Sequence, residues 1–308
     1  MIENLSSIID IPKSLNSQTI IDVISKLNNF VKQDKISRLV INFWDTKFVT
    51  PGGLNPLLCY LRELPKVKKF EGLIVSNEAT SVHNYISRMG FFTLLGMQDD
   101  YNLNPHSPDG RFKELVCFDK NTPETQLINI NEEVVKSFVN NSDNENYKNA
   151  IRWCLWELVD NARVHSNSND CTLFAQKYPS NNLTEFCIAD RGMGIRETMG
   201  CSDILDALQR ALTKEGKGIN STGKGNGLHF TSELIKVDKS KKISMLSILS
   251  ENGIVKIISG QEPVIEKVET FWKGTIVTLS LNQEIQTNLE DVMGQTIYKD
   301  EDLPDFYI

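Results

Sequence analysis

Hydrophobic and polar positions in the first hundred residues alternate between strand-like and helix-like patterns. After Ser37 the run RLVINFWDTKFV is apolar enough for a strand, and TPGGL breaks it before LNPLLCYLREL, whose apolar residues recur at helical spacing. A second strand is predicted at GLIVS, followed by an amphipathic helix in SVHNYISRMGFFTLLG that stops at Gly90. Alternating strands and helices of this kind indicate an α/β layer.

A long helix is predicted between Asn144 and Ser166. In NYKNAIRWCLWELVDNARVHS every fourth residue from position 150 to 162 is apolar, which is typical of a helix packed on a sheet, and the tryptophan pair fits core packing. Glu157, Asn161 and His165 recur four residues apart and therefore lie on a different face, where they can point into a common cavity. An amide oxygen and a carboxylate in such a row suit a magnesium ion with a general base beside it.

A strand that ends in an acidic, glycine-rich turn follows. LTEFCIADRGMGI is apolar up to Asp190, and Gly192 and Gly194 permit backbone conformations and a close ligand approach that a side chain would block. A carboxylate at the end of a strand can accept a hydrogen bond from an exocyclic amine such as that of adenine.

Two further glycine motifs come later in the chain. STGKGNGLHFTSELIKV places Gly223, Gly225 and Gly227 at alternate positions before an amphipathic helix that begins near Leu228. Backbone amides and a helix N-terminus of this kind form a cradle for anions. In WKGTIVTLSL, Thr275 opens an alternating strand, so its hydroxyl can lie beside a ligand at the edge of the sheet.

Composition narrows the class of protein. The net charge of -7 argues against a surface that binds nucleic acid, and 40% hydrophobic with 24% charged residues is ordinary for a globular protein. The first residues carry no basic leader and no apolar run is long enough to span a membrane, so we expect a cytoplasmic protein. The cysteines form no CxxC pair and are expected to be reduced core residues; they lie at positions 59, 117, 154, 171, 187 and 201.

The order and spacing of the four motifs resemble the GHKL ATPase family of histidine kinases, anti-sigma kinases, DNA gyrase and MutL. The helix with ExxxN, the strand with DxGxG, the GxGxG loop and the terminal GT strand succeed one another across roughly residues 130 to 282. The resemblance implies a two-layer α/β sandwich, the Bergerat fold, that binds ATP and Mg²⁺.

The resemblance also implies a role for each residue. Asn161 would bind magnesium, Glu157 would be the catalytic base and Asp190 would hold the adenine amino group. The other nucleotide contacts would come from Gly192, Gly194, Gly223, Lys224, Gly225, Gly227, Leu228 and Thr275. A lid would span about 195–226, where Lys217 or Lys224 could touch the γ-phosphate, the alternative being an exposed lid charge.

The N-terminal part resembles the STAS fold of anti-anti-sigma factors, in which a strand enters a turn that opens a helix. The corresponding turn runs from Thr50 to Leu54, and Pro51 stands at the position of the phospho-accepting serine. Thr50 is the one hydroxyl nearby, and as a strand-end residue it is assigned a structural role. We therefore expect an α/β chain with a STAS-like domain at 1–115, a GHKL domain at 116–282 and an acidic tail at 283–308.

These features favour a regulator of the anti-sigma-kinase type that controls a protein partner by its nucleotide state, with phosphorylation of a serine or threonine on that partner left open. The four histidines, at 83, 106, 165 and 229, lie in no dimerising helix before the ATP unit, which argues against a sensor kinase. One alternative is an ATP-driven dimerisation clamp, which the short segment after the last strand disfavours. A scaffold that binds nucleotide without turnover is the other, and a homodimer also stays open.

Overall fold

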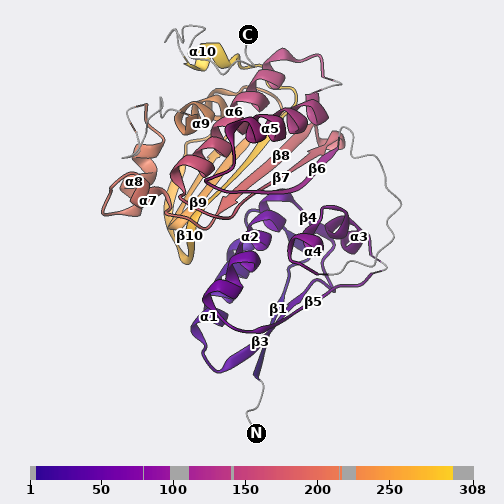
Figure 1. Cartoon of the computed structure of the whole chain (residues 1–308). Coiled ribbons are helices and arrows are strands. Elements are labelled where there is room, and N and C mark those ends of the chain that lie inside the picture. Colours follow the sequence, from indigo (N-terminus) through magenta and orange to yellow (C-terminus); the bar gives the residue numbers. More distant parts are fainter. Residues whose placement is uncertain are drawn as a thin grey trace.

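The computed structural model describes residues 5–78, 80–97, 111–139, 142–214, 216 and 227–293. It is a mixed α/β protein with a three-stranded sheet, a five-stranded sheet and a two-stranded ladder (Figure 1). None of the helices in these ranges is long and apolar enough to cross a membrane.

The N-terminal part is built on parallel strands. The three-stranded sheet has the order β1-β3-β5 with every pair parallel, and β2 pairs with β4 in a second, two-stranded ladder. The elements are β1 (Leu5–Asp10), β2 (Ser14–Leu15), α1 (Ile20–Lys32), β3 (Ile36–Asn42), β4 (Phe48–Val49), α2 (Pro51–Val67), β5 (Glu71–Val75), α3 (Ser81–Arg88) and α4 (Phe91–Leu94).

Of two predictions for the N-terminal part, the structure contradicts one and confirms the other. The single strand predicted after Ser37 was wrong, because a turn separates β3 from β4: the Asn42 side chain accepts the Trp44 N–H at 3.0 Å, and the Thr46 N–H donates to the Phe43 carbonyl. The predicted stop at Gly90 is confirmed. Gly90 has a φ of 79°, which ends one helix and leads directly into the short α4.

The C-terminal part is an antiparallel sheet with helices on one face. Its strand order is β6-β7-β8-β10-β9, and β6 spans position 115, where the sequence placed a domain boundary. The elements are β6 (Phe112–Phe118), α5 (Glu124–Val139), α6 (Glu145–His165), β7 (Cys171–Tyr178), η1 (Pro179–Asn181), β8 (Leu183–Asp190), α7 (Ile195–Thr198), α8 (Ile204–Ala211), α9 (Gly227–Val237), β9 (Met245–Ile258), β10 (Val264–Asn282) and α10 (Leu289–Met293).

Helix α6 begins and faces the sheet as predicted. The side chain of Asn144 accepts the Tyr147 N–H and so caps the first turn. The predicted apolar stripe is buried, and the two tryptophans belong to the same hydrophobic cluster, with Trp153 and Trp156 only 5% and 7% exposed. Helices α5, α6 and α9 together cover this face of the five-stranded sheet (Figure 1).

Helices α1 and α2 lie between the two sheets and cover the opposite face of the five-stranded sheet (Figure 1). Because α2 has apolar residues on all sides, it is buried almost throughout its first three turns. Asn55, fully buried in α2, donates hydrogen bonds to the carbonyls of Thr172 and Cys187 at 3.1 and 2.8 Å. These bonds attach the N-terminal helix directly to the backbones of β7 and β8.

The first turn of α2 approaches the neighbouring backbone so closely that it requires glycine. A Cβ on Gly53 would lie 2.5 Å from the carbonyl carbon and oxygen of Leu15, which cannot move aside as a side chain can. A Cβ on Gly72 would meet only the ring edge of Phe70, at 3.0 Å.

Gly53→Ala is expected to destabilise the protein by about 2 kcal/mol, although alanine normally favours a helix over glycine. The matched control Gly72→Ala is expected to change the free energy of unfolding by less than about 0.5 kcal/mol. Urea unfolding monitored by circular dichroism measures both. Equal midpoints for Gly53→Ala and the wild type would show that the two backbones do not meet at this distance.

Candidate functional site

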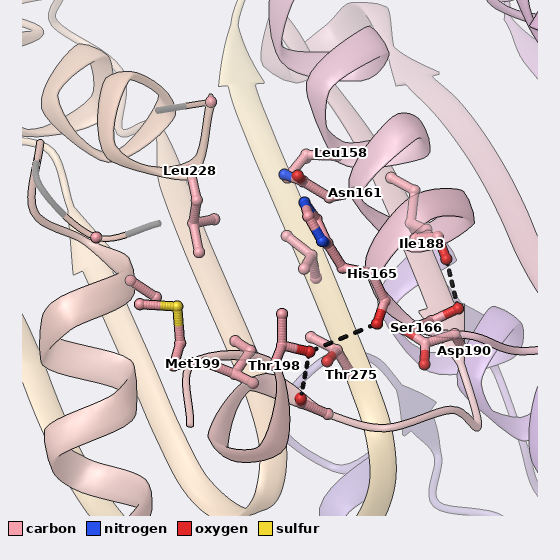
Figure 2. Close-up of a pocket in the computed structure, with 17 residues that line it drawn as sticks. Leu158, Asn161, His165, Ser166, Ile188, Asp190, Thr198, Met199, Leu228 and Thr275 are labelled. Carbon is pink, nitrogen blue, oxygen red and sulfur yellow. Dashed lines mark hydrogen bonds between the residues drawn. The ribbon is translucent and has the colours of Figure 1, made fainter. Parts of the chain in front are cut away.

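A pocket opens between the C-terminal half of α6, the end of β8, the middle of β10 and the segment from Gly194 to Met199 (Figure 2). It contains about 820 Å³ of empty space, a volume that includes the solvent in its open mouth. The lining residues are Leu158, Asn161, Ala162, His165, Ser166, Ile188, Asp190, Gly194, Ile195, Thr198, Met199, Ala211, Gly216, Gly227, Leu228, Thr275 and Val277.

Asp190 is the buried acidic group of this pocket. It ends β8 with 3% of its surface exposed, and its Oδ1 accepts the Gly192 N–H at 2.8 Å. Burial raises the pKa of the Asp190 carboxyl to about 7, while its backbone hydrogen bonds act in the opposite direction. A carboxylate that accepts hydrogen bonds from the backbone N–H groups of Gly192 and Thr275 retains further lone pairs for a ligand.

Glycines shape the backbone around Asp190. A Cβ on Gly192 would overlap the Ser166 carbonyl, and one on Gly274, where φ is 96°, would overlap Asp190 itself. Gly194 also has a positive φ of 80°. The glycines therefore let two loops close around the carboxylate at a distance that no side chain allows.

Helix α6 contributes polar side chains to the same space. Figure 2 shows Asn161 and His165 extending from α6 toward the gap that Leu228 and Met199 border on the other side. Burial lowers the pKa of His165, which favours the neutral imidazole.

Glu157 lies one turn earlier on α6, next to the start of α9. A Cβ on Gly227 would overlap the Glu157 carboxylate, so the two residues are in contact. Burial, with a smaller contribution from the charge of Asp160, raises the pKa of Glu157 to about 7. A carboxyl with a pKa near neutrality suits proton transfer.

The structure brings together most of the residues singled out in the sequence. Those that line the pocket are Asn161, Asp190, Gly194, Gly227, Leu228 and Thr275. Gly192 stands behind Asp190, and Glu157 reaches the pocket region through Gly227. Gly223, Lys224, Gly225 and Lys217 fall outside the described residues.

Sequence reasoning missed the apolar wall and the hydroxyl of Thr198. Ile188 and Val277 alternate with Asp190 and Thr275 along their strands, so a period of two could have identified them. Thr198, whose hydroxyl donates to the Gly194 carbonyl at 2.8 Å, had no comparable signal.

Comparison with protein families, with curated proteins and with solved structures gives no match to this chain. The chemistry of the pocket is therefore inferred from its own residues.

Replacement of the buried Asp190 tests the environment of the pocket. The pKa of about 7 in the folded protein is higher than the value of about 4 in an unfolded chain, so the folded state holds a proton that the unfolded state releases. The resulting stabilisation is present below about pH 4 and is lost as the pH rises to about 7.

The difference in the free energy of unfolding between Asp190→Asn and the wild type is therefore expected to shift in favour of the variant by about 1 to 3 kcal/mol as the pH rises from 5 to 8. Urea unfolding across this pH range measures the difference. Asp45→Asn, which changes an exposed carboxylate, serves as the control and should follow the wild type at every pH. A difference for Asp190→Asn that does not vary with pH would contradict the raised pKa.

Proposed function

We propose that this pocket binds ATP with Mg²⁺ and that the protein is a nucleotide-dependent regulator of the GHKL type. The observation that supports the proposal best is the convergence of residues from four separate segments on one pocket. Asn161 comes from α6, Asp190 from the end of β8, Gly227 from the start of α9 and Thr275 from β10. These are the segments that carry the four sequence motifs.

The inner end of the pocket suits a purine base. Asp190 supplies a buried acceptor for an exocyclic amine, and apolar side chains such as Ile188 and Val277 offer a flat, dry surface for the ring. A buried acceptor discriminates strongly, because a ligand that lacks the matching donor leaves the carboxylate unpaired.

The outer end suits phosphates. The start of α9 at Gly227 borders the pocket, and the N–H groups in the first turn of a helix favour an anion. Among the described residues no cluster of three His, Cys, Asp or Glu side chains could hold a metal alone. Asn161 would therefore hold magnesium together with phosphate oxygens, and the ion would neutralise charge on the phosphates.

Glu157 is assigned the role of general base. It lies beside Gly227, at the phosphate end, and its pKa of about 7 lets it accept a proton near neutral pH. The proton would come from an attacking water in an ATPase or from a serine or threonine hydroxyl of a partner protein in a kinase. Without turnover the protein would be a nucleotide-binding scaffold.

The N-terminal part, which we interpret as STAS-like, would connect the nucleotide site to a protein partner. The turn with Pro51 is docked on the five-stranded sheet, where the Gly52 N–H donates to Glu185 at 2.7 Å. Thr50 is 7% exposed. Both features favour a structural turn over a phosphate acceptor.

Binding of MgATP tests the proposal directly. Isothermal titration calorimetry should show saturable binding by the wild type, and Asn161→Ala and Asp190→Asn should each weaken it by about 10- to 100-fold. The Asn161→Ala effect should disappear with EDTA present, because the asparagine acts through the metal. Asn146→Ala, on the same helix, should bind like the wild type. No heat of binding by the folded wild type would refute the proposed function.

The pH dependence of turnover tests the role of Glu157. Phosphate release, or transfer to a partner, should rise with pH through a midpoint of about 7, because the base must be deprotonated. Glu157→Gln should lose about 100-fold or more of this rate and still bind MgATP, whereas Glu145→Gln on the same helix should keep it. MgATP binding without turnover in the wild type would leave the scaffold as the correct alternative.

A further inference from the structure

A second cavity lies on the other side of the five-stranded sheet, at the junction with the N-terminal part. It contains about 630 Å³ of empty space, including its open side. One wall is formed by β4 with the residue before it and by the start of α3, and the other by the end of β7. The lining residues are Lys47, Phe48, Val49, Ser81, Val82, Tyr85, Gln176 and Tyr178.

The hydroxyl group of Tyr178 is the unusual feature of this cavity. It is buried and has no hydrogen-bond partner among the residues that the structure describes. The neighbouring phenol of Tyr85, in contrast, donates to the Gln176 side chain at 2.8 Å. A buried donor without an acceptor costs roughly 1–3 kcal/mol, so a ligand that brings an acceptor recovers this energy.

Three of the other lining residues are aromatic or aliphatic. The ring of Phe48 lies 6.2 Å from that of Tyr178 and is half exposed, and Val49 and Val82 are buried beside them. These groups offer faces and edges for a flat ring, a contact that aromatic side chains favour.

The cavity has a basic group in its described lining and the buried carboxylate of Glu185 behind it, whose charge adds to the effect of burial in raising the pKa of the Tyr178 and Tyr85 phenols. Lys47 is the charged side chain in the described lining, and it is exposed at the rim. Glu185, opposite Gln176 on the next strand, has its carboxylate turned to the Gly52 N–H and is not part of the lining. An ammonium at the rim above an apolar chamber matches a ligand with one carboxylate on an aromatic ring.

We propose that this cavity binds a small aromatic carboxylate: the ring lies among Phe48, Val49 and Val82, one acceptor pairs with the Tyr178 hydroxyl, and Lys47 neutralises the charge. Since the walls come from both parts of the chain, the bound ligand stabilises their junction. The site is separate from the nucleotide pocket, because the two have no lining residue in common within the described ranges.

Benzoate and its neutral counterpart benzamide are suitable probes, titrated into the full chain by saturation-transfer NMR. Benzoate is expected to bind with a Kd of about 0.1–5 mM, as fits so small a ligand. Tyr178→Phe should weaken the binding of both probes by about 5- to 10-fold, because each probe loses the hydrogen bond from the Tyr178 hydroxyl. Lys47→Gln should weaken the binding of benzoate by about 3- to 10-fold and leave the binding of benzamide unchanged. The control variant Lys35→Gln, at an exposed lysine, should alter the binding of neither probe.

Folding is checked independently of binding. Tyr178→Phe removes a hydroxyl without a partner in the described part of the chain, so its Tm should match or exceed that of the wild type. Asp190→Asn should bind benzoate like the wild type, which separates this site from the nucleotide proposal whether or not ATP binds. Absence of saturable benzoate binding, equal binding by Tyr178→Phe and the wild type, or loss of binding in Asp190→Asn would each overturn the assignment.

Discussion

The burial of α2 against the five-stranded sheet is the contact on which the arrangement of this protein depends. A sheet covered by helices on one face leaves the other face exposed, and here α1 and α2 cover it. The hydrophobic cluster on this side combines N-terminal residues such as Leu57 and Leu58 with Phe174 and Ile276 of the sheet. The two parts of the chain therefore share a core, which makes their relative position a matter of packing and not of a linker.

The same contact reaches the end of β8. Arg191, directly after Asp190, lies over the rings of Tyr60 and Trp272, with its guanidinium carbon 4.3 and 4.7 Å from the two centroids. The Trp272 indole N–H also donates to the Asp190 carbonyl at 2.9 Å. An N-terminal tyrosine thus helps to fix the backbone of the residue whose side chain faces the first pocket. Buried cation–π and hydrogen-bond contacts of this kind hold a strand end rigid.

The sequence was informative where a local pattern determines the structure. The face of α6 follows from helical periodicity, the end of β8 from the apolar run that stops at Asp190, and the start of α9 from the glycines that precede its apolar residues. The break between β3 and β4 could not be read in the same way, because side-chain and backbone hydrogen bonds of Asn42 and Phe43 produce it inside an apolar stretch. The docking of α2 was equally hidden. Asn55 looks like any helical asparagine until its partners, more than a hundred residues later, are placed beside it.

The carboxyls of Glu185, Asp190 and Glu157 differ in how the fold treats their charge. Glu185 receives a backbone N–H from the first turn of α2, where the helix dipole also favours a negative group. Burial raises the pKa of Asp190 to about 7 in spite of its backbone hydrogen bonds. Burial, with a smaller contribution from the charge of Asp160, raises the pKa of Glu157 to about 7. A fold selected for stability alone would replace such groups or give each a cation. Asp190 and Glu157 stand in or beside one pocket, next to glycines whose lack of a side chain lets the backbone approach closely. Such an arrangement is expected where groups that are unfavourable for stability are kept for a site.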